Sequence, residues 1–239
     1  MTGTLYGLGV GPGDPELITL KAHRILQAAA VVAYPAPDTG ESLARAIAAP
    51  HIPAGRIEIA IVTPMVPGKF PAHDVYDKYA ADISTHLSAG RDVAVLCEGD
   101  PFLYGSFMYL FARLAGDFPT RVVPGVSSLG ACAAAAGVPL VGRNETLAIL
   151  PGPLPEDELE ARLRDASAAA IMKLGRHLPK VRRVLERLGL TRDAHYVAHA
   201  TMDEQRAVPL ADVAEETAPY FSMILVRRSG DEAGAEAAV

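Results

Sequence analysis

The chain has 239 residues, half of them hydrophobic and 21% charged, which is typical of a globular protein with one large domain or two smaller ones. Its net charge of −6, with acidic and basic residues interspersed, disfavours a nucleic-acid or anionic-membrane surface. No basic segment followed by an apolar one marks a secretory signal, and the longest apolar run, 129–141, is too short to cross a bilayer. We therefore expect a cytoplasmic protein that binds neither nucleic acid nor membrane.

Short apolar segments alternate with helical patterns along the chain, which predicts an α/β fold with largely parallel pairing in the first half. The expected strands are 4–10, 30–34, 56–61, 92–96, 121–123, 146–150, 168–173, 194–199 and 222–227. The expected helices are 15–28, 42–48, 73–89, 106–114, 127–136, 156–165, 178–188 and 210–217. Because the segment 137–144 interrupts this alternation, we expect two domains, 1–124 and 125–239. Their boundary falls between 124 and 144, and a flexible tail starts near residue 230.

The first glycine-rich loop follows an expected strand and precedes an expected helix, as in dinucleotide-binding folds. Gly9 and Gly11 fit that fingerprint, but the third glycine position holds Asp14. Asp14 followed by Pro15 is typical of a helix N-cap, and a carboxylate there repels phosphate. Pro12 also lacks the backbone N–H that a phosphate cradle would use. The loop therefore disfavours a dinucleotide.

Two further glycine-bearing loops follow expected strands, at 96–107 and 123–128. Asp100 stands at the apex of the first one, where a purely structural turn has no special need of an acid. Ser127 and Ser128 lie in the second, where each can cap a helix or donate to a ligand. Ligands collect at the carboxyl ends of strands in open α/β sheets. The three loops therefore predict one composite binding site.

Several other residues have a plain structural interpretation. Cys97 and Cys132 lack the spacing of a zinc site and are expected to be buried small hydrophobes. His195 and His199 lie in a segment that alternates like a strand, where their side chains would be about 13 Å apart, so no metal site is predicted. The basic amphipathic segment 177–190 is expected to pack one face on the core. The aromatic and aliphatic residues expected in the core at helical spacing are Phe107, Leu110 and Phe111.

Four motifs resemble those of the tetrapyrrole methylase family, the class III S-adenosylmethionine-dependent methyltransferases. They are GVGPGDPELITLKA, EGDPFLYGS, VPGVSS and ATMDEQ, in the family's order and spacing over nearly the full chain. CEGDPFLYGSFMYL, PGVSSLGACAAAAGVPL, IMKLGRHL and TPMVPGKFPAHDVYDKYAADI resemble the branch that methylates precorrin-2, whereas uroporphyrinogen methyltransferases typically have GGDP at residues 98–101. The resemblance thus implies methyl transfer from S-adenosylmethionine to the meso carbon C-20 of precorrin-2 in corrin biosynthesis.

The resemblance also implies two α/β domains with the active site in the cleft between them, and a homodimer. The cofactor-binding residues carried over from the family's motifs are Pro12, Glu98, Gly99, Asp100, Phe102, Tyr104, Gly105, Ser106, Ser127, Ser128, Lys173, Leu174, His199, Ala200 and Thr201. The candidates for binding the substrate, whose carboxylates would attract cations, are Pro12, Lys69, Arg143, Arg176 and His177. Because the electron-rich substrate carbon is itself the nucleophile, the chain need only position it and remove a proton. Tyr104 and Glu98 are the candidate bases, and His177 is a third, less favoured candidate.

Alternatives stay open at this point. The acceptor can be cobalt-loaded precorrin-2, another precorrin position, uroporphyrinogen, or a macromolecule such as ribosomal RNA or a translation factor, as in some relatives. The RNA interpretation needs a basic trough that the net charge of −6 does not support. A different class of protein, a non-catalytic S-adenosylmethionine-binding module, would bind the cofactor without modifying any tetrapyrrole.

Overall fold

The computed structural model describes residues 1–63 and 73–228, and the chain divides into two compact units. Unit 1 comprises Met1–Ser127 and unit 2 comprises Ser128–Val239, and each has a sheet and a hydrophobic core of its own. The predicted substrate residue Lys69 and the tail predicted to be flexible lie outside the described residues. Within the described part of the chain, no helix is both long enough and apolar enough to cross a membrane.

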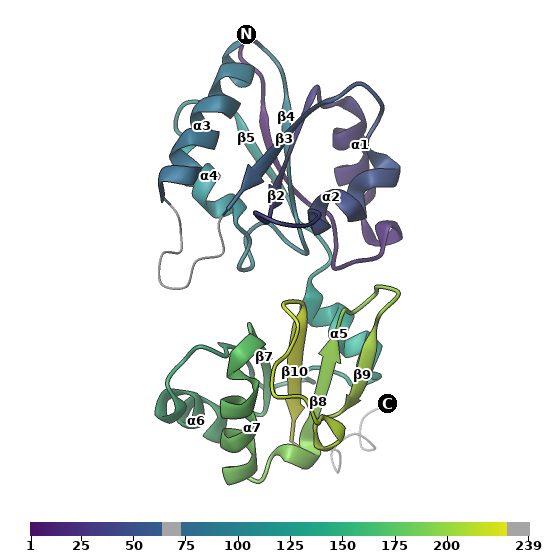
Figure 1. Cartoon of the computed structure of the whole chain (residues 1–239), viewed down its shortest axis with the longest axis vertical. Helices are drawn as coiled ribbons and strands as arrows, with labels where there is room; N and C mark the ends of the chain where they lie inside the picture. The colour runs from purple at the N-terminus through teal and green to yellow at the C-terminus, as the bar shows by residue number, and fades with distance from the viewer. Residues whose placement is uncertain (64–72, 229–239) are drawn as a thin grey trace. The chain divides into compact units, whose positions relative to one another are not determined.

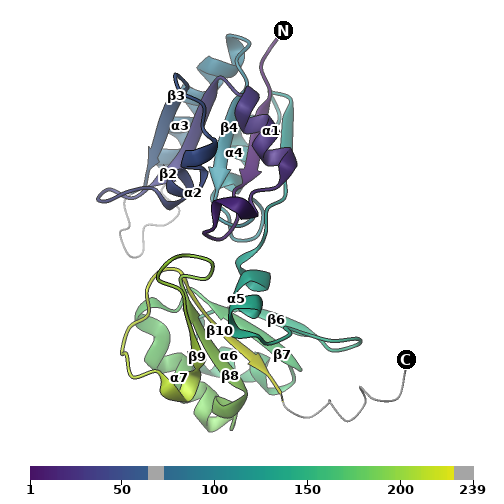
Figure 2. The same ribbon diagram turned by 90° about the vertical axis from the view of Figure 1, so that its right-hand side faces the viewer.

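Unit 1 is built on a sheet of five parallel strands in the order β3-β2-β4-β1-β5 (Figures 1 and 2). The strands are β1 (Leu5–Gly9), β2 (Val31–Ala36), β3 (Ile57–Val62), β4 (Val93–Cys97) and β5 (Thr120–Val123). Every residue of β4 is buried, as expected of a central parallel strand covered on both faces. The parallel pairing predicted for the first half of the chain is confirmed.

Helices cover both faces of this sheet, and their placement creates a switch point between β1 and β4. The helices are α1 (Leu20–Ala28), α2 (Leu43–Ala48), α3 (His73–Ser88) and α4 (Phe107–Leu114). Buried residues of α1 and α2 pack with one face of the sheet, and those of α3 and α4 pack with the other. The neighbouring strands β1 and β4 therefore lead into helices on opposite faces, the arrangement that opens a ligand crevice at the strands' carboxyl ends.

The helix predicted over residues 15–28 is two separate elements. Asp14 caps only a single 3₁₀ turn, Pro15–Leu17, by accepting a hydrogen bond from the Glu16 N–H at 2.8 Å. Thr19 then caps α1, because its Oγ1 accepts from the Ala22 N–H at 3.2 Å. The N-cap predicted at Asp14 is confirmed, but the long helix is wrong, since Thr19 restarts the chain with extended dihedrals.

Unit 2 contains a mixed sheet in the order β6-β7-β10-β8-β9. The strands are β6 (Leu147–Pro151), β7 (Ala168–Met172), β8 (Ala194–Ala198), β9 (Arg206–Pro209) and β10 (Ser222–Arg227). Only β6 and β7 pair in parallel, whereas β10 runs antiparallel to both β7 and β8. The helices are α5 (Ser128–Ala136), α6 (Glu156–Arg164) and α7 (Leu178–Arg187). Residues of α6 and α7 pack in one core, and α5, whose buried residues are small, packs in another.

Two predictions in unit 2 are wrong. The helix predicted over 210–217 is a single 3₁₀ turn, Leu210–Asp212, because Val213 takes extended dihedrals and is buried in the core. Strand β9 was not predicted at all, since it is short, lies at the sheet edge and contains Arg206 and a terminal proline.

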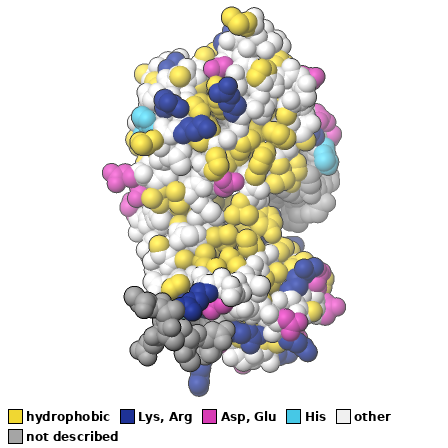
Figure 3. All heavy atoms as spheres, turned by 180° about the vertical axis from the view of Figure 1, so that it is seen from behind, with side chains coloured by type: hydrophobic (Ala, Val, Ile, Leu, Met, Phe, Trp, Pro, Cys, Tyr) yellow, Lys and Arg dark blue, Asp and Glu magenta, His cyan; other side chains and the backbone are white. Residues whose placement is uncertain are grey.

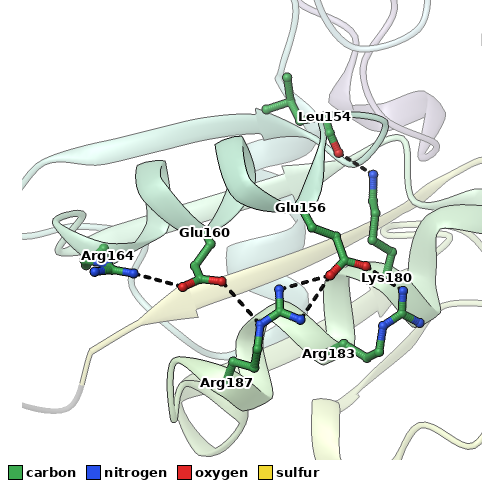
Figure 4. A network of polar contacts seen from close by, with 7 residues as sticks. All are labelled: Leu154, Glu156, Glu160, Arg164, Lys180, Arg183 and Arg187. Atoms are coloured by element: carbon green, nitrogen blue, oxygen red, sulfur yellow. Dashed lines mark hydrogen bonds and ion pairs between the residues drawn. The ribbon is translucent and has the colours of Figure 1, made fainter.

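The basic segment 177–190 contributes to an ion-pair network between α6 and α7 (Figure 4). Glu156 contacts Arg183 at 2.6 Å and Arg187 at 3.0 Å, and Glu160 contacts Arg187 at 3.3 Å. The opposite side of α7 carries buried Leu178, Val181, Val184 and Leu185. The amphipathic packing predicted for this segment is confirmed, and acids of α6 neutralise two of its arginines.

Candidate functional site

The carboxyl edge of the first sheet brings the three glycine-bearing loops together. A Cβ atom added at Gly125 would lie 2.0 Å from Gly99 O and 2.7 Å from Gly9 Cα. One added at Gly9 would lie 2.5 Å from Gly125 Cα. Gly99 N–H also donates to Gly11 O at 2.7 Å. The predicted convergence of the three loops is therefore confirmed, and only residues without side chains allow the backbones this close.

Asp100 ties two of these loops together. Its Oδ1 accepts a hydrogen bond from the Phe102 N–H at 2.9 Å, and its Oδ2 accepts one from the Gly125 N–H at 3.1 Å. The sequence interpretation that a structural turn has no special need of an acid here is wrong, because both carboxylate oxygens hold backbone donors. A direct contact of Asp100 with a cofactor stays a prediction.

Glu98 is an acid at the end of β4, partly shielded from solvent. Burial raises the pKa of its carboxyl, and hydrogen bonds from its own N–H and that of Ala44 oppose the rise. Among the described residues it forms no ion pair of 4 Å or less. A carboxyl with a raised pKa at a switch point is suited to holding or accepting a proton.

The loop that follows Glu98 ends in an exposed tyrosine with strained backbone. Tyr104 has a φ of 56° and is 42% exposed. A Cβ atom added at Gly105 would lie 2.4 Å from Pro101 O, so the loop folds tightly back on itself. Ser106 stands at the N-cap of α4 but does not cap it with its side chain. A backbone strained in this way is a feature that clusters at functional sites.

The candidate residues of unit 2 share a sheet edge and the same kind of strain. Lys173, His199 and Thr201 have φ values of 57°, 51° and 67°. Lys173 follows β7 and His199 follows β8, and these strands flank β10 and run in the same direction. The Leu174 side chain is fully buried in the core with α7, and Ala200 is also buried, so any ligand contact of Leu174 would involve its backbone.

The predicted substrate-binding residues are spread over both units. Pro12 is buried. Arg143 and Arg176 are exposed, and Arg143 has a φ of 38°. His177 lies partly buried in the 3₁₀ turn before α7, where burial and then the charges of Lys180 and Arg176 lower its pKa.

The structure thus forms two groups of candidate residues. In unit 1, residues 98–106 meet the loop that ends at Ser127, and in unit 2, Lys173 and His199 share one edge. Ser128 is the first residue of α5. Cys97 and Cys132 are buried as predicted, and burial raises the pKa of both thiols, that of Cys132 to about 12.

Sequence reasoning missed two features of the unit 1 edge. Tyr76, which is buried in α3 and whose pKa burial raises, was not singled out, because nothing in the pattern of α3 distinguishes it from other core residues. Phe111 was expected in the core with Phe107 and Leu110, which are buried, but it is 36% exposed. A third apolar residue one turn on from Phe107 could have been interpreted as lying at the margin of the buried face.

The face drawn in Figure 3 carries no continuous basic surface of the kind that binds nucleic acid. On the face drawn in Figure 3, Lys and Arg side chains lie in small groups among hydrophobic and acidic ones. In residues 1–63 and 73–228, no group of three or more His, Cys, Asp or Glu side chains could hold a metal ion.

Comparison with known proteins matches residues 4–214 to the model of the tetrapyrrole (corrin/porphyrin) methylases. The precorrin-2 C(20)-methyltransferase of Sinorhizobium sp. is 43% identical over 94% of this chain and 95% of its own length. The cobalt-precorrin-2 C(20)-methyltransferase of Salmonella typhimurium is 31% identical over 98% of this chain and all of its own length.

A longer relative and a solved structure are also similar to this chain over most of its length. The cobalamin biosynthesis protein CobIJ of Mycobacterium tuberculosis is 46% identical over 94% of this chain, which spans only 46% of that protein. A uroporphyrin-III C-methyl transferase of Thermus thermophilus, solved with S-adenyl homocysteine, has a TM-score of 0.68 at 27% identity and covers 94% of this chain and 92% of its own.

Proposed function

Since the chain belongs to the tetrapyrrole methylase family, we propose that it transfers a methyl group from S-adenosylmethionine to C-20 of precorrin-2, in cobalamin biosynthesis. The observation that carries this proposal is the convergence of Gly9, Gly99 and Gly125 at a switch point of a parallel sheet, in a chain that matches the family over residues 4–214. The 43% identity with a precorrin-2 C(20)-methyltransferase supports the choice of acceptor.

The residues at the unit 1 edge suit S-adenosylmethionine better than a phosphate-bearing cofactor. Asp14 already occupies a helix-start donor, the Glu16 N–H, and the three loops meet through close-packed glycines without bulky side chains. We propose that residues 98–106, with Ser127 and Ser128, hold the methionine end of the cofactor. The strained residues of unit 2, with Leu174 and Ala200, would hold its adenine side. When bound, the cofactor supplies an electrophilic methyl group.

Two residues of unit 1 can take up the proton that the methylated carbon releases. Glu98 is the stronger candidate, because burial raises its pKa toward the range in which a carboxylate works as a base. Tyr104 is exposed in the same loop and has a strained backbone. His177 is in unit 2, where burial lowers its pKa and so favours the neutral imidazole, but it lies outside the loops that carry the motifs.

The metal-free acceptor is preferred over the cobalt-loaded one. The relative named for precorrin-2 is 43% identical and the one named for cobalt-precorrin-2 is 31% identical. Arg143, Arg176 and Lys69 remain proposed partners of the substrate's carboxylates. A homodimer and a cytoplasmic location are likewise proposed from the family resemblance.

The proposal is tested by incubating the protein with S-adenosylmethionine and either precorrin-2 or its cobalt complex. The masses of the products are then measured by mass spectrometry. One added methyl group on precorrin-2, formed faster than on the cobalt complex, is expected. Binding of the cofactor without any methylated product would instead favour a non-catalytic binding module.

A further inference from the structure

Exposed apolar side chains are concentrated in one stretch of unit 1. Phe102, Tyr104, Met108 and Phe111 are 49%, 42%, 37% and 36% exposed, and all lie within ten residues. The whole stretch from 102 to 111 contains no charged residue. Exposed apolar groups that gather in this way mark a binding surface more often than scattered ones do.

The rings of Phe102 and Phe111 are held on a rigid base. Their centroids are 5.2 Å apart in an edge-to-face arrangement, and each lies 6.1 Å from the ring of Phe107. Phe107 is fully buried and fills the space over β1, where a Cβ atom added at Gly7 would come within 2.5 Å of its ring. Two exposed rings that pack at an angle against a buried third ring lose little conformational freedom when a ligand covers them.

These rings lie next to the edge where the three glycine-bearing loops meet. The Phe102 N–H donates to Asp100, whose other oxygen accepts from Gly125. Phe111 lies in the second turn of α4, the helix that runs beside α3 (Figure 1). We propose that Phe102 and Phe111 form an aromatic ledge that binds a flat face of the tetrapyrrole macrocycle, an inference that rests on the proposed function.

The chemistry of the ledge fits a macrocycle better than a second copy of the chain. The face of a tetrapyrrole is flat and apolar while its carboxylates lie at the rim, so an uncharged aromatic surface matches the face alone. The nearest cation along α4, Arg113, is already engaged by Asp77 at 2.6 Å and by Tyr109 O at 2.9 Å. The four exposed side chains offer about 300 Å², well below the roughly 800 Å² per partner of a stable protein interface.

The test is the variant Phe111→Ser, with Phe111→Tyr as the conservative variant and Leu20→Ser as the matched control. Leu20 is 90% exposed at the start of α1, so its truncation removes exposed apolar surface elsewhere in unit 1. Phe111→Ser should raise KM for precorrin-2 about three- to tenfold, with kcat and the Kd for S-adenosylmethionine unchanged. Phe111→Tyr should restore KM, and Leu20→Ser should not change it.

A second readout separates this inference from the proposed function. Quenching of uroporphyrin III fluorescence, which needs no methyl transfer, should weaken by a similar factor in Phe111→Ser and not in Leu20→Ser. If KM and porphyrin binding are the same in Phe111→Ser as in the unaltered protein, the ledge is not a substrate surface. A Phe111→Ser protein that sediments as a smaller species with unchanged KM would show that a second copy covers the ledge.

Discussion

The carboxyl edge of the first sheet and the edge of the second sheet that carries Lys173 and His199 hold candidate residues in opposite ways. In unit 1 the backbones approach each other through glycines, and a Cβ atom at Gly125 would overlap Gly99 O. In unit 2, non-glycine residues adopt the left-handed conformation that glycine would adopt without strain. The contact between the glycine loops of the first edge thus needs the absence of side chains, whereas Lys173, His199 and Thr201 retain side chains at a cost in backbone energy, as Tyr104 does in unit 1. We propose that these retained side chains are used in binding.

Removing the close approach at the first edge is expected to have the largest effect. Gly125→Ala should lower the free energy of unfolding by about 2–3 kcal/mol, because the new methyl group meets backbone that cannot move aside. It should also abolish detectable binding of S-adenosylmethionine. Urea denaturation and calorimetry measure both.

Gly116→Ala is the control, since nothing lies within 4 Å of a Cβ atom at that position. Its stability should stay within about 0.5 kcal/mol of the unaltered protein. Equal stability and affinity in Gly125→Ala would show that the three loops do not depend on their contact.

Asp100→Asn should have the next largest effect. An amide can offer one acceptor where the carboxylate offers two, so either the Phe102 N–H or the Gly125 N–H loses its partner. We expect a loss of about 1–3 kcal/mol in the free energy of unfolding, together with weaker binding of S-adenosylmethionine. If affinity falls while the urea midpoint is unchanged, Asp100 contacts the cofactor directly instead of acting through the loops.

Lys173→Gly tests whether the strain at the second edge is retained for function. Glycine adopts a φ of 57° freely, so stability should rise by roughly 1 kcal/mol, while affinity for S-adenosylmethionine should fall about tenfold. Arg143→Gly is the control: it relieves backbone strain at a φ of 38°, but the side chain that it removes is not proposed to bind the cofactor. The affinity for S-adenosylmethionine should therefore stay unchanged. Unaltered affinity in Lys173→Gly would remove the argument from strain.

Glu98→Gln should have the smallest effect on stability, and it should raise the free energy of unfolding at pH 7. Burial raises the carboxyl's pKa above its ordinary value of 4.5, so the folded state holds this proton more tightly than the unfolded state does. The corresponding stability is present below pH 4.5 and is lost as the pH rises through the folded pKa. Glutamine stays neutral, so the variant should be more stable than the unaltered protein at pH 7 and equal to it near pH 4.

Catalysis is expected to change in the opposite direction. If Glu98 accepts the proton, Glu98→Gln lowers kcat and removes the acidic limb of its pH profile. Tyr104→Phe serves as the comparison, since it removes the other candidate base from the same loop. An unchanged kcat and pH profile in Glu98→Gln would assign the proton transfer elsewhere.

Much of the fold could be predicted because buried parallel strands are near-continuous apolar runs. β4 is one such run and was located within one residue at each end. Local polar signals were also informative, as at Asp14, but Thr19 shows that a second cap inside one periodic segment divides the helix. β9 was missed because a half-exposed edge strand lacks the apolar run.

Contacts between distant residues could not be predicted from the pattern. The role of Asp100 depends on Gly125, 25 residues away, and becomes visible only when the two loops are placed side by side. Positive φ values at Lys173 and Thr201 have no signature in sequence, since neither residue type favours the left-handed conformation. The motifs therefore identified the loops, while the structure identified how the loops are held.

The central claim, methylation at a single meso carbon, is tested most directly by transfer from S-adenosylmethionine that carries a carbon-13 methyl group. The protein is incubated with precorrin-2, and the product is examined by carbon NMR. The account predicts one new labelled methyl signal, attached to C-20. A labelled methyl at any other carbon, or no labelled product from a protein that binds the cofactor, would contradict it.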